Sequence, residues 1–143
     1  MSTASTAGPG VLGTAAQGRP RLRAAAAGAA MATLVNSGLW LGGRAADVSF
    51  KVPDSLVSEV DLVSVVLTTP LMFTVGWGLL TLAARRSRRW VRALLVVAAL
   101  FAMVSSAAPL TTAADTATGV LLATMHLVTG ATFVATAARV RGR

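Results

Sequence analysis

Few side chains in this sequence could do chemistry beyond carrying a fixed charge. The chain has one histidine and no cysteine. The histidine, His126, falls near the middle of an apolar stretch at residues 117–138. An ionisable group at that depth of a membrane helix is rare and suggests a functional role. Two interpretations stay open: a site for a proton or ligand, and a neutral imidazole that hydrogen-bonds to a neighbouring helix.

Helical spacing predicts which way His126 faces. Gly119, Ala123 and Gly130 lie 7, 3 and 4 residues from it, which places all four residues on one face of a helix. A stripe of small residues permits close approach of another helix. We therefore expect His126 to point into a bundle.

Polar residues in the other apolar stretches could join His126. Counting helix rise from the acidic ends of the stretches, His126 lies about 14 Å deep, Thr68 and Thr69 about 12 Å, Asn36 about 9 Å and Ser105 about 7 Å. The sequence thus predicts an intramembrane polar layer in the outer half of the bundle, made of Asn36, Thr68, Thr69, Ser105 and His126. Such a layer could line an outward-open pocket beside the bend expected at Pro70.

Four arginines in five residues form a second conspicuous feature, the basic turn of Arg85, Arg86, Arg88 and Arg89. A cluster of this kind between two apolar stretches resists translocation, so it orients the flanking helices and stays cytoplasmic. It can also contact anionic lipid headgroups. A sharper hypothesis makes it a docking site for an acidic partner or a phosphorylated lipid.

Other chemistry is not expected. The absence of cysteine excludes disulfides and thiolate chemistry and removes the commonest zinc ligands. Asp54 and Asp61 lie seven residues apart, but one histidine and no cysteine make a metal site improbable. We find no catalytic constellation and no phosphate loop, so we expect no enzyme, no cofactor and no metal. A net charge of +8 without any tyrosine does not favour nucleic acid.

The elements that position these residues are membrane spans. Apolar residues make up 55% of the 143-residue chain and charged residues only 13%, and they come in blocks of about 20 residues, the length that crosses a bilayer as a helix. We predict spans at about 24–42, 60–84, 90–110 and 117–138 within one membrane domain, 24–138. Residues 1–23 are expected to be a disordered basic cytoplasmic tail, and residues 139–143 a short basic cytoplasmic tail.

The first two spans raise local questions. A signal peptide is the alternative for the first span, but its apolar core is too long. Between residues 43 and 53, Val48, Phe50 and Val52 alternate with polar residues, which indicates a short strand or an interfacial lid. Asp54 or Ser55 is predicted to cap the second helix, so that its first two turns project beyond the hydrocarbon.

The placement of charge tests the four-span topology. If the basic turn is cytoplasmic, 11 of the 13 basic residues lie on the same side, and Arg44 and Lys51 alone lie outside. All five acidic residues lie outside as well. This bias is the one that the positive-inside rule describes. The sequence therefore predicts an all-α, integral membrane four-helix bundle in a bacterial plasma membrane, with both termini cytoplasmic.

Two segments carry a resemblance to a known family. They are Gly76-Trp77-Gly78-Leu79-Leu80, which runs into the basic turn and Trp90, and Ala123-Thr124-Met125-His126-Leu127-Val128. With the Ser105–Pro109 end of the third span, they resemble the short four-span membrane proteins of high-GC Gram-positive bacteria grouped as domain of unknown function family 6069. The resemblance covers about residues 24–138. It implies a four-helix membrane domain and no assigned activity.

Two functions follow as hypotheses. The first is a structural or accessory membrane subunit whose arginines hold lipid or a partner, as a homo-oligomer or with another membrane protein. The second is a small oligomeric transporter or channel that uses the layer around His126. Small residues at Gly28, Ala32, Gly76 and Gly78 permit close helix packing within the bundle or in a homodimer.

Overall fold

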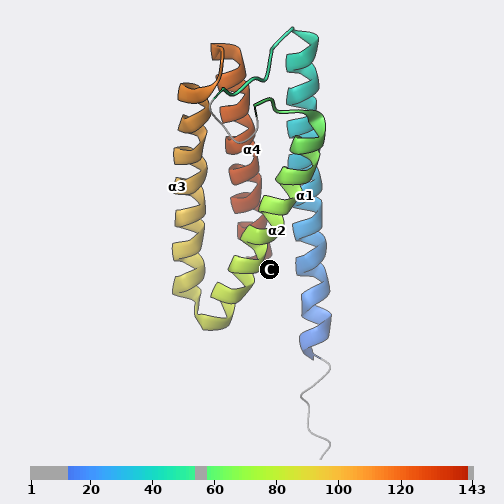
Figure 1. The fold of residues 1–143 in the computed structure, drawn as a ribbon. Helices are drawn as coiled ribbons and strands as arrows, with labels where there is room; N and C mark the ends of the chain where they lie inside the picture. The colour runs from blue at the N-terminus through green and yellow to red at the C-terminus, as the bar shows by residue number, and fades with distance from the viewer. Residues whose placement is uncertain (1–12, 54–57, 142–143) are drawn as a thin grey trace, which may run out of the picture.

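The computed structural model describes residues 13–53 and 58–141 as an antiparallel bundle of four helices (Figure 1). The helices are α1 (Gly13–Ala45), α2 (Leu62–Arg86), α3 (Arg88–Thr112) and α4 (Thr116–Arg141). Each of them contains a stretch long and apolar enough to cross a membrane. The predicted all-α, four-helix membrane fold is therefore confirmed, and the chain is a multi-pass integral membrane protein.

The helices extend beyond the predicted spans. The predicted disordered tail is wrong for residues 13–23, because α1 begins at Gly13; residues 1–12 lie outside the described residues. Adding residues to an existing helix costs little once a nucleus has formed, and the alanine-rich start of the first span allows this growth. At the other end of the chain, α4 continues through Arg141, into the predicted C-terminal tail. The turn between α2 and α3 shrinks to Ser87 alone.

The second helix begins later than predicted. Its N-cap is Asp61, whose carboxylate Oδ1 accepts a hydrogen bond from the backbone N–H of Ser64 at 2.7 Å. Glu59 lies in an antiparallel bridge with Lys51 instead of in a helix. The prediction of a helix before Asp61 is therefore wrong for residues 58–60, because the backbone there pairs with the preceding loop. The predicted caps Asp54 and Ser55 lie outside the described residues.

Aromatic rings and small residues hold the bundle together in the half nearer the basic turn, whose end we name the arginine end. Phe133 of α4 makes edge-to-face contacts with Phe73 and Trp77 of α2, with ring centroids 5.4 and 6.4 Å apart. A Cβ at Gly76 would come within 3.0 Å of the Phe133 ring, and a Cβ at Gly28 would clash with Phe73. Both glycines are thus used for packing inside the bundle, as one of the two interpretations predicted.

The loop between α1 and α2 packs over the opposite end of the bundle, which we name the outer end. Phe50 is completely buried and stacks on Trp40, and Val52 is buried beside it. The Nε1–H of Trp40 donates to the carbonyl of Val60 at 2.9 Å. Phe50 has a φ of 54°, in the left-handed region that side chains disfavour. The loop is therefore a packed lid in its described part, as one of the two interpretations predicted.

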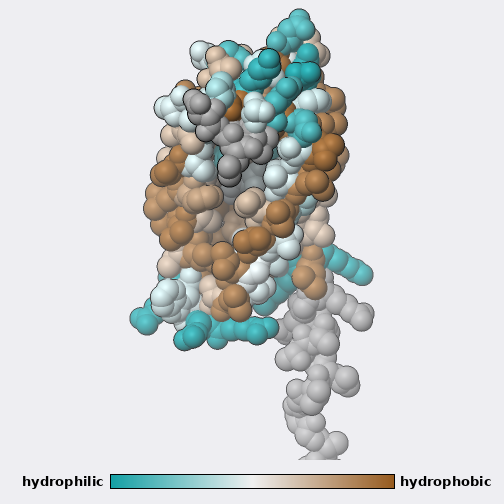
Figure 2. Space-filling view, in the orientation of Figure 1, coloured by the Kyte–Doolittle hydropathy of each residue, from teal (hydrophilic) through white to brown (hydrophobic). Residues whose placement is uncertain are grey.

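The second helix crosses the bundle obliquely (Figure 1). At the arginine end it approaches α3 and α4, and towards the outer end it leans against α1. On the face shown in Figure 2, hydrophobic residues form a broad band, and hydrophilic residues gather at its two ends. This distribution is the one expected for a bundle surrounded by lipid.

Candidate functional site

Asn36 is the centre of a buried polar contact among three helices. Its side chain is 2% exposed. Its Nδ2 group donates to the hydroxyl of Thr69 on α2 at 3.2 Å and to the hydroxyl of Thr129 on α4 at 2.9 Å. The structure thus brings together Asn36 and Thr69 of the predicted layer and adds Thr129, which sequence reasoning missed. We call these three residues the polar node.

The hydrogen-bond roles within the node follow from Thr129. Its hydroxyl donates to the carbonyl of Met125 at 2.9 Å, so it can only accept from Asn36 and must face the amide nitrogen. The other amide atom, Oδ1 of Asn36, is buried without a hydrogen-bond partner. An unpaired buried acceptor is costly, so the node carries both a stabilising and a destabilising element.

His126 does not join the node. It is exposed, and its Nδ1 lies 2.8 Å from the carbonyl of Leu122 one turn earlier. Because a carbonyl only accepts, Nδ1 carries the proton in this contact. In the neutral imidazole, Nε2 then has the lone pair. The prediction that His126 points into the bundle is therefore wrong, because its side chain is exposed.

The exposure of His126 results from the path of α2. Seven residues separate His126 from Phe133, so the two side chains leave α4 within about 20° of each other. Phe133 is covered by Phe73 and Trp77 of α2. Nearer the outer end α2 leans towards α1, where Trp40 and Asn36 contact it. The arc of α4 that carries His126 is left uncovered there.

The remaining members of the predicted layer lie apart. Thr68 is exposed, and its hydroxyl donates to the carbonyl of Ser64 in its own helix. Ser105 is half-buried and bonds in the same way to the carbonyl of Ala102. Hydroxyls satisfied within one helix do not need a partner from another helix. Neither residue belongs to the polar node.

Sequence reasoning also missed a group of hydrogen bonds at the outer end that is centred on Asp115. The Asp115 carboxylate accepts bonds from the backbone N–H of Thr118 at 2.7 Å, from the Ser49 hydroxyl at 2.7 Å and from the Thr118 hydroxyl at 2.8 Å. These bonds, led by the one from the Thr118 backbone, hold the pKa of Asp115 below its ordinary value. The Thr118 hydroxyl also accepts from the backbone N–H of Phe50 at 3.1 Å. Together they tie the lid to the start of α4.

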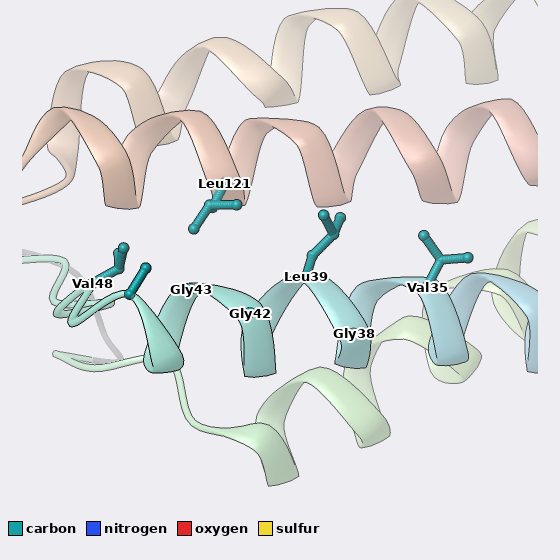
Figure 3. Close-up of a pocket in the computed structure, with 8 residues that line it drawn as sticks. Val35, Gly38, Leu39, Gly42, Gly43, Val48 and Leu121 are labelled. Atoms are coloured by element: carbon teal, nitrogen blue, oxygen red, sulfur yellow. The ribbon is translucent and has the colours of Figure 1, made fainter.

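The α1–α4 flank carries an open apolar groove of about 470 Å³ (Figure 3). Val35 and Leu39 of α1 point towards α4, and Leu121 of α4 points back towards α1. Its other lining residues are Gly38, Gly42, Gly43, Ala46 and Val48. A Cβ at Gly38 or Gly42 would meet no atom within 4 Å. We call this surface the α1 flank.

The basic turn lies where it was predicted, at the end of the bundle opposite the lid. Arg85 and Arg86 end α2, and Arg88 and Arg89 begin α3. All four are exposed. Among the described residues, the recorded ion pair joins Arg44 to Glu59 at the outer end, with 3.5 Å between Nη1 and Oε1.

The chemical capacity of these sites is limited. Within residues 13–53 and 58–141, no group of three His, Asp or Glu side chains is placed to hold a metal ion. The polar node can bind helices together, and His126 Nε2 can accept a hydrogen bond or a proton. The α1 flank offers shape and apolar contact.

Comparisons with known proteins identify the family and nothing further. The model of a family of unknown function, DUF6069, matches residues 16–143. No curated protein and no solved structure matches the chain. Because the match covers almost the whole chain, the chain belongs to this family.

Proposed function

We propose that this member of the DUF6069 family is a structural or accessory subunit of a membrane assembly and not an enzyme. The observation that supports this proposal is the α1 flank, where two glycines one helical turn apart face open space beside an apolar groove. The occupant we propose is one aliphatic transmembrane helix, from a second copy of this chain or from another membrane protein.

The glycines support a helix as the occupant. Glycine in a helix costs about 1 kcal/mol relative to alanine, so its use calls for a packing advantage. At Gly28, Gly43, Gly76, Gly119 and Gly130 that advantage is internal, because a neighbour lies where a Cβ would be. Among the described residues, Gly38, Gly42 and Gly78 gain no such contact, and of these three the first two lie one helical turn apart. Their four-residue spacing is the one that lets two membrane helices approach closely.

The geometry of the polar groups favours this role over transport. Thr69 and Thr129 are bound by Asn36, and Thr68, Ser105 and Thr129 bond to carbonyls within their own helices. A transport path would need polar groups free to exchange partners. The groove itself is apolar and does not include His126.

Site-specific cross-linking in membranes tests the proposal. A photoreactive residue at Val35, which lines the groove and is 40% exposed, should form one discrete adduct with a membrane helix. The variant Gly38→Leu/Gly42→Leu should abolish that adduct. Gly78→Leu is the matched control, because a Cβ there also meets open space. An adduct that survives the double substitution would contradict the proposed occupant, and the mass of the adduct separates a homo-oligomer from a heteromeric complex.

A small oligomeric transporter or channel is the second candidate, and the exposure of His126 favours it. His126 Nε2 is available for a proton or solute. In vesicles containing the purified protein, this candidate predicts a proton or solute flux that His126→Gln reduces. The subunit proposal predicts equal flux in both proteins at the level of empty vesicles.

We also propose that the protein lies in a bacterial plasma membrane with both termini cytoplasmic. The support is the separation of charge, since the four described acidic residues lie at the outer end and the basic turn at the other. Reporter fusions at Arg143 and in the lid would test it. A signal from the far side of the membrane at Arg143 would contradict it.

A further inference from the structure

The arginine end of the bundle carries a concentrated, uncompensated positive charge. Eight described arginines are exposed there: Arg21, Arg23, Arg85, Arg86, Arg88, Arg89, Arg92 and Arg139. The described acidic residues Asp47, Glu59, Asp61 and Asp115 belong to the lid, the start of α2 and the α3–α4 turn, all at the outer end. The charge of the arginines is therefore balanced by something outside the described chain.

The depth of the arginines in the membrane indicates what balances their charge. The 25 residues of α2 span about 37 Å, compared with a hydrocarbon thickness of about 30 Å. With the Asp61 cap at the outer interface, Arg85 and Arg86 reach the phosphate layer of the other leaflet. Trp90, at the start of α3, is 56% exposed and is suited to anchor the helix at the same interface.

The arginines also continue the surfaces of α2 and α3 that face lipid. Arg86 lies on the same helix face as Leu82, Leu79 and Val75, which are 58, 50 and 52% exposed. A side chain at the end of such a stripe meets the headgroups of the lipids whose tails cover the stripe.

Arg92 shows the same arrangement on α3. It lies in one line with Val96 and Leu100, both more than half exposed, one turn deeper than Arg88. An arginine at that depth reaches back to the headgroups with its long side chain. It is well placed for a lipid phosphate and badly placed for a soluble acidic protein.

The α2–α3 turn adds backbone donors to this surface. Ser87 precedes α3, but its side chain makes no capping hydrogen bond, and no acidic residue lies in the first turn of α3. The free N–H groups of a helix N-terminus favour a nearby anion. They strengthen a surface whose main component is the guanidinium charge.

We propose that the arginine end is a binding surface for anionic phospholipids, in which the basic turn and Arg92 hold headgroup phosphates while the lipid tails lie along α2 and α3. The surface is independent of the α1 flank, because it lies at the end of the bundle and the groove lies in the outer half. Loss of a partner helix from the α1 flank would leave lipid binding unchanged. Loss of lipid binding would likewise leave the binding of a partner helix unchanged.

Lipid binding to the full chain in a neutral detergent tests the proposal. Phosphatidylglycerol and phosphatidylcholine are added separately, and bound lipids are counted by native mass spectrometry. We expect preferential binding of phosphatidylglycerol that weakens with salt. Replacing Arg85, Arg86, Arg88 and Arg89 with glutamine should weaken it by about fivefold per arginine. Arg44→Gln/Lys51→Gln, which removes two charges at the outer end, should leave it unchanged.

Further measurements separate the remaining outcomes. If the variant with four substitutions fails to fold, two double variants are tested separately, Arg85→Gln/Arg86→Gln and Arg88→Gln/Arg89→Gln. We expect each to lose about the same affinity for phosphatidylglycerol per arginine. Inorganic phosphate at the same concentration should not displace the lipid; displacement would mean a site for a free anion and would overturn the proposal. Equal binding of both lipids by the unmodified protein, or undiminished binding by the glutamine variants, would overturn it as well.

Discussion

Replacing Asn36 should cost less stability than replacing the Thr129 hydroxyl that it contacts, although Asn36 makes more hydrogen bonds between helices. Asn36→Leu keeps the approximate volume and removes two interhelical hydrogen bonds, worth about 0.6 kcal/mol each on average in membrane proteins. It also removes the unpaired Oδ1, whose burial costs about 1 kcal/mol or more. The two effects nearly cancel, and we expect a change within about 1 kcal/mol of zero.

Thr129→Val acts differently because it leaves Asn36 in place. Valine has the shape of threonine but cannot accept the hydrogen bond from Nδ2. One amide N–H then stays buried and unpaired in addition to the unpaired Oδ1. The expected loss is about 1–2 kcal/mol, within the usual cost of an unsatisfied buried donor.

A double-mutant cycle measures the difference. The free energy of unfolding is determined by titration with a denaturing detergent in mixed micelles. In the Asn36→Leu background, Thr129→Val should cost less than about 0.5 kcal/mol, which gives a coupling of about 1 kcal/mol. Thr124→Val is the control, since the Thr124 hydroxyl donates to the carbonyl of Val120 in its own helix. An equal cost of Thr129→Val in both backgrounds would refute the geometry of the node.

Three further predictions concern the outer end. Because the pKa of Asp115 is lowered from 3.8, the stability that its ionised form contributes is present above that value and lost as pH falls through the lowered pKa. Trp40 fluorescence should report lid opening in that window, and Asp115→Asn should reduce the pH dependence to the part that Asp61 contributes, whose pKa is lowered as well. Asp47 is exposed with a φ of 59°, so Asp47→Gly should raise the thermal midpoint, with a gain of up to about 1 kcal/mol. Trp40→Phe removes the bond to Val60 and should cost about 1 kcal/mol in the same unfolding titration, whereas an unchanged midpoint would show that water replaces it.

Hydropathy predicted the four helices well, because an apolar stretch of about 20 residues has few solutions in lipid other than a helix. It could not predict where α2 starts. Asp54 and Asp61 both offer a capping carboxylate, and the choice depends on the pairing of Val60 N–H with the carbonyl of Phe50 at 2.9 Å. The alternation of Val48, Phe50 and Val52 indicates an extended segment, but it does not indicate which residues pair with that segment.

The sequence predicts the depth of the polar node in the membrane, but it does not predict which side chains face one another there. Asn36 and Thr69 were placed at similar depths, and they are in contact. Thr68 and Thr69 are adjacent and chemically identical, so only the rotation of α2 decides which one faces Asn36. Thr129 was missed because a threonine in an apolar helix usually bonds to its own backbone, as Thr129 also does. Its second contact depends on the crossing of three helices.

His126 shows how the two ends of α2 determine the accessibility of a single side chain. At the arginine end, the ring contacts of Phe73 and Trp77 with Phe133 hold α2 against α4. Towards the outer end, the bonds from Asn36 and Trp40 hold it against α1. A helix held at both ends in this way cannot also cover His126. Covering His126 would require α2 to leave α1, which breaks the bonds from Asn36 and Trp40. The polar node and the exposure of His126 are therefore two consequences of one helix position, and a substitution that releases α2 from α1 should reduce the reactivity of His126 towards a membrane-permeant imidazole reagent.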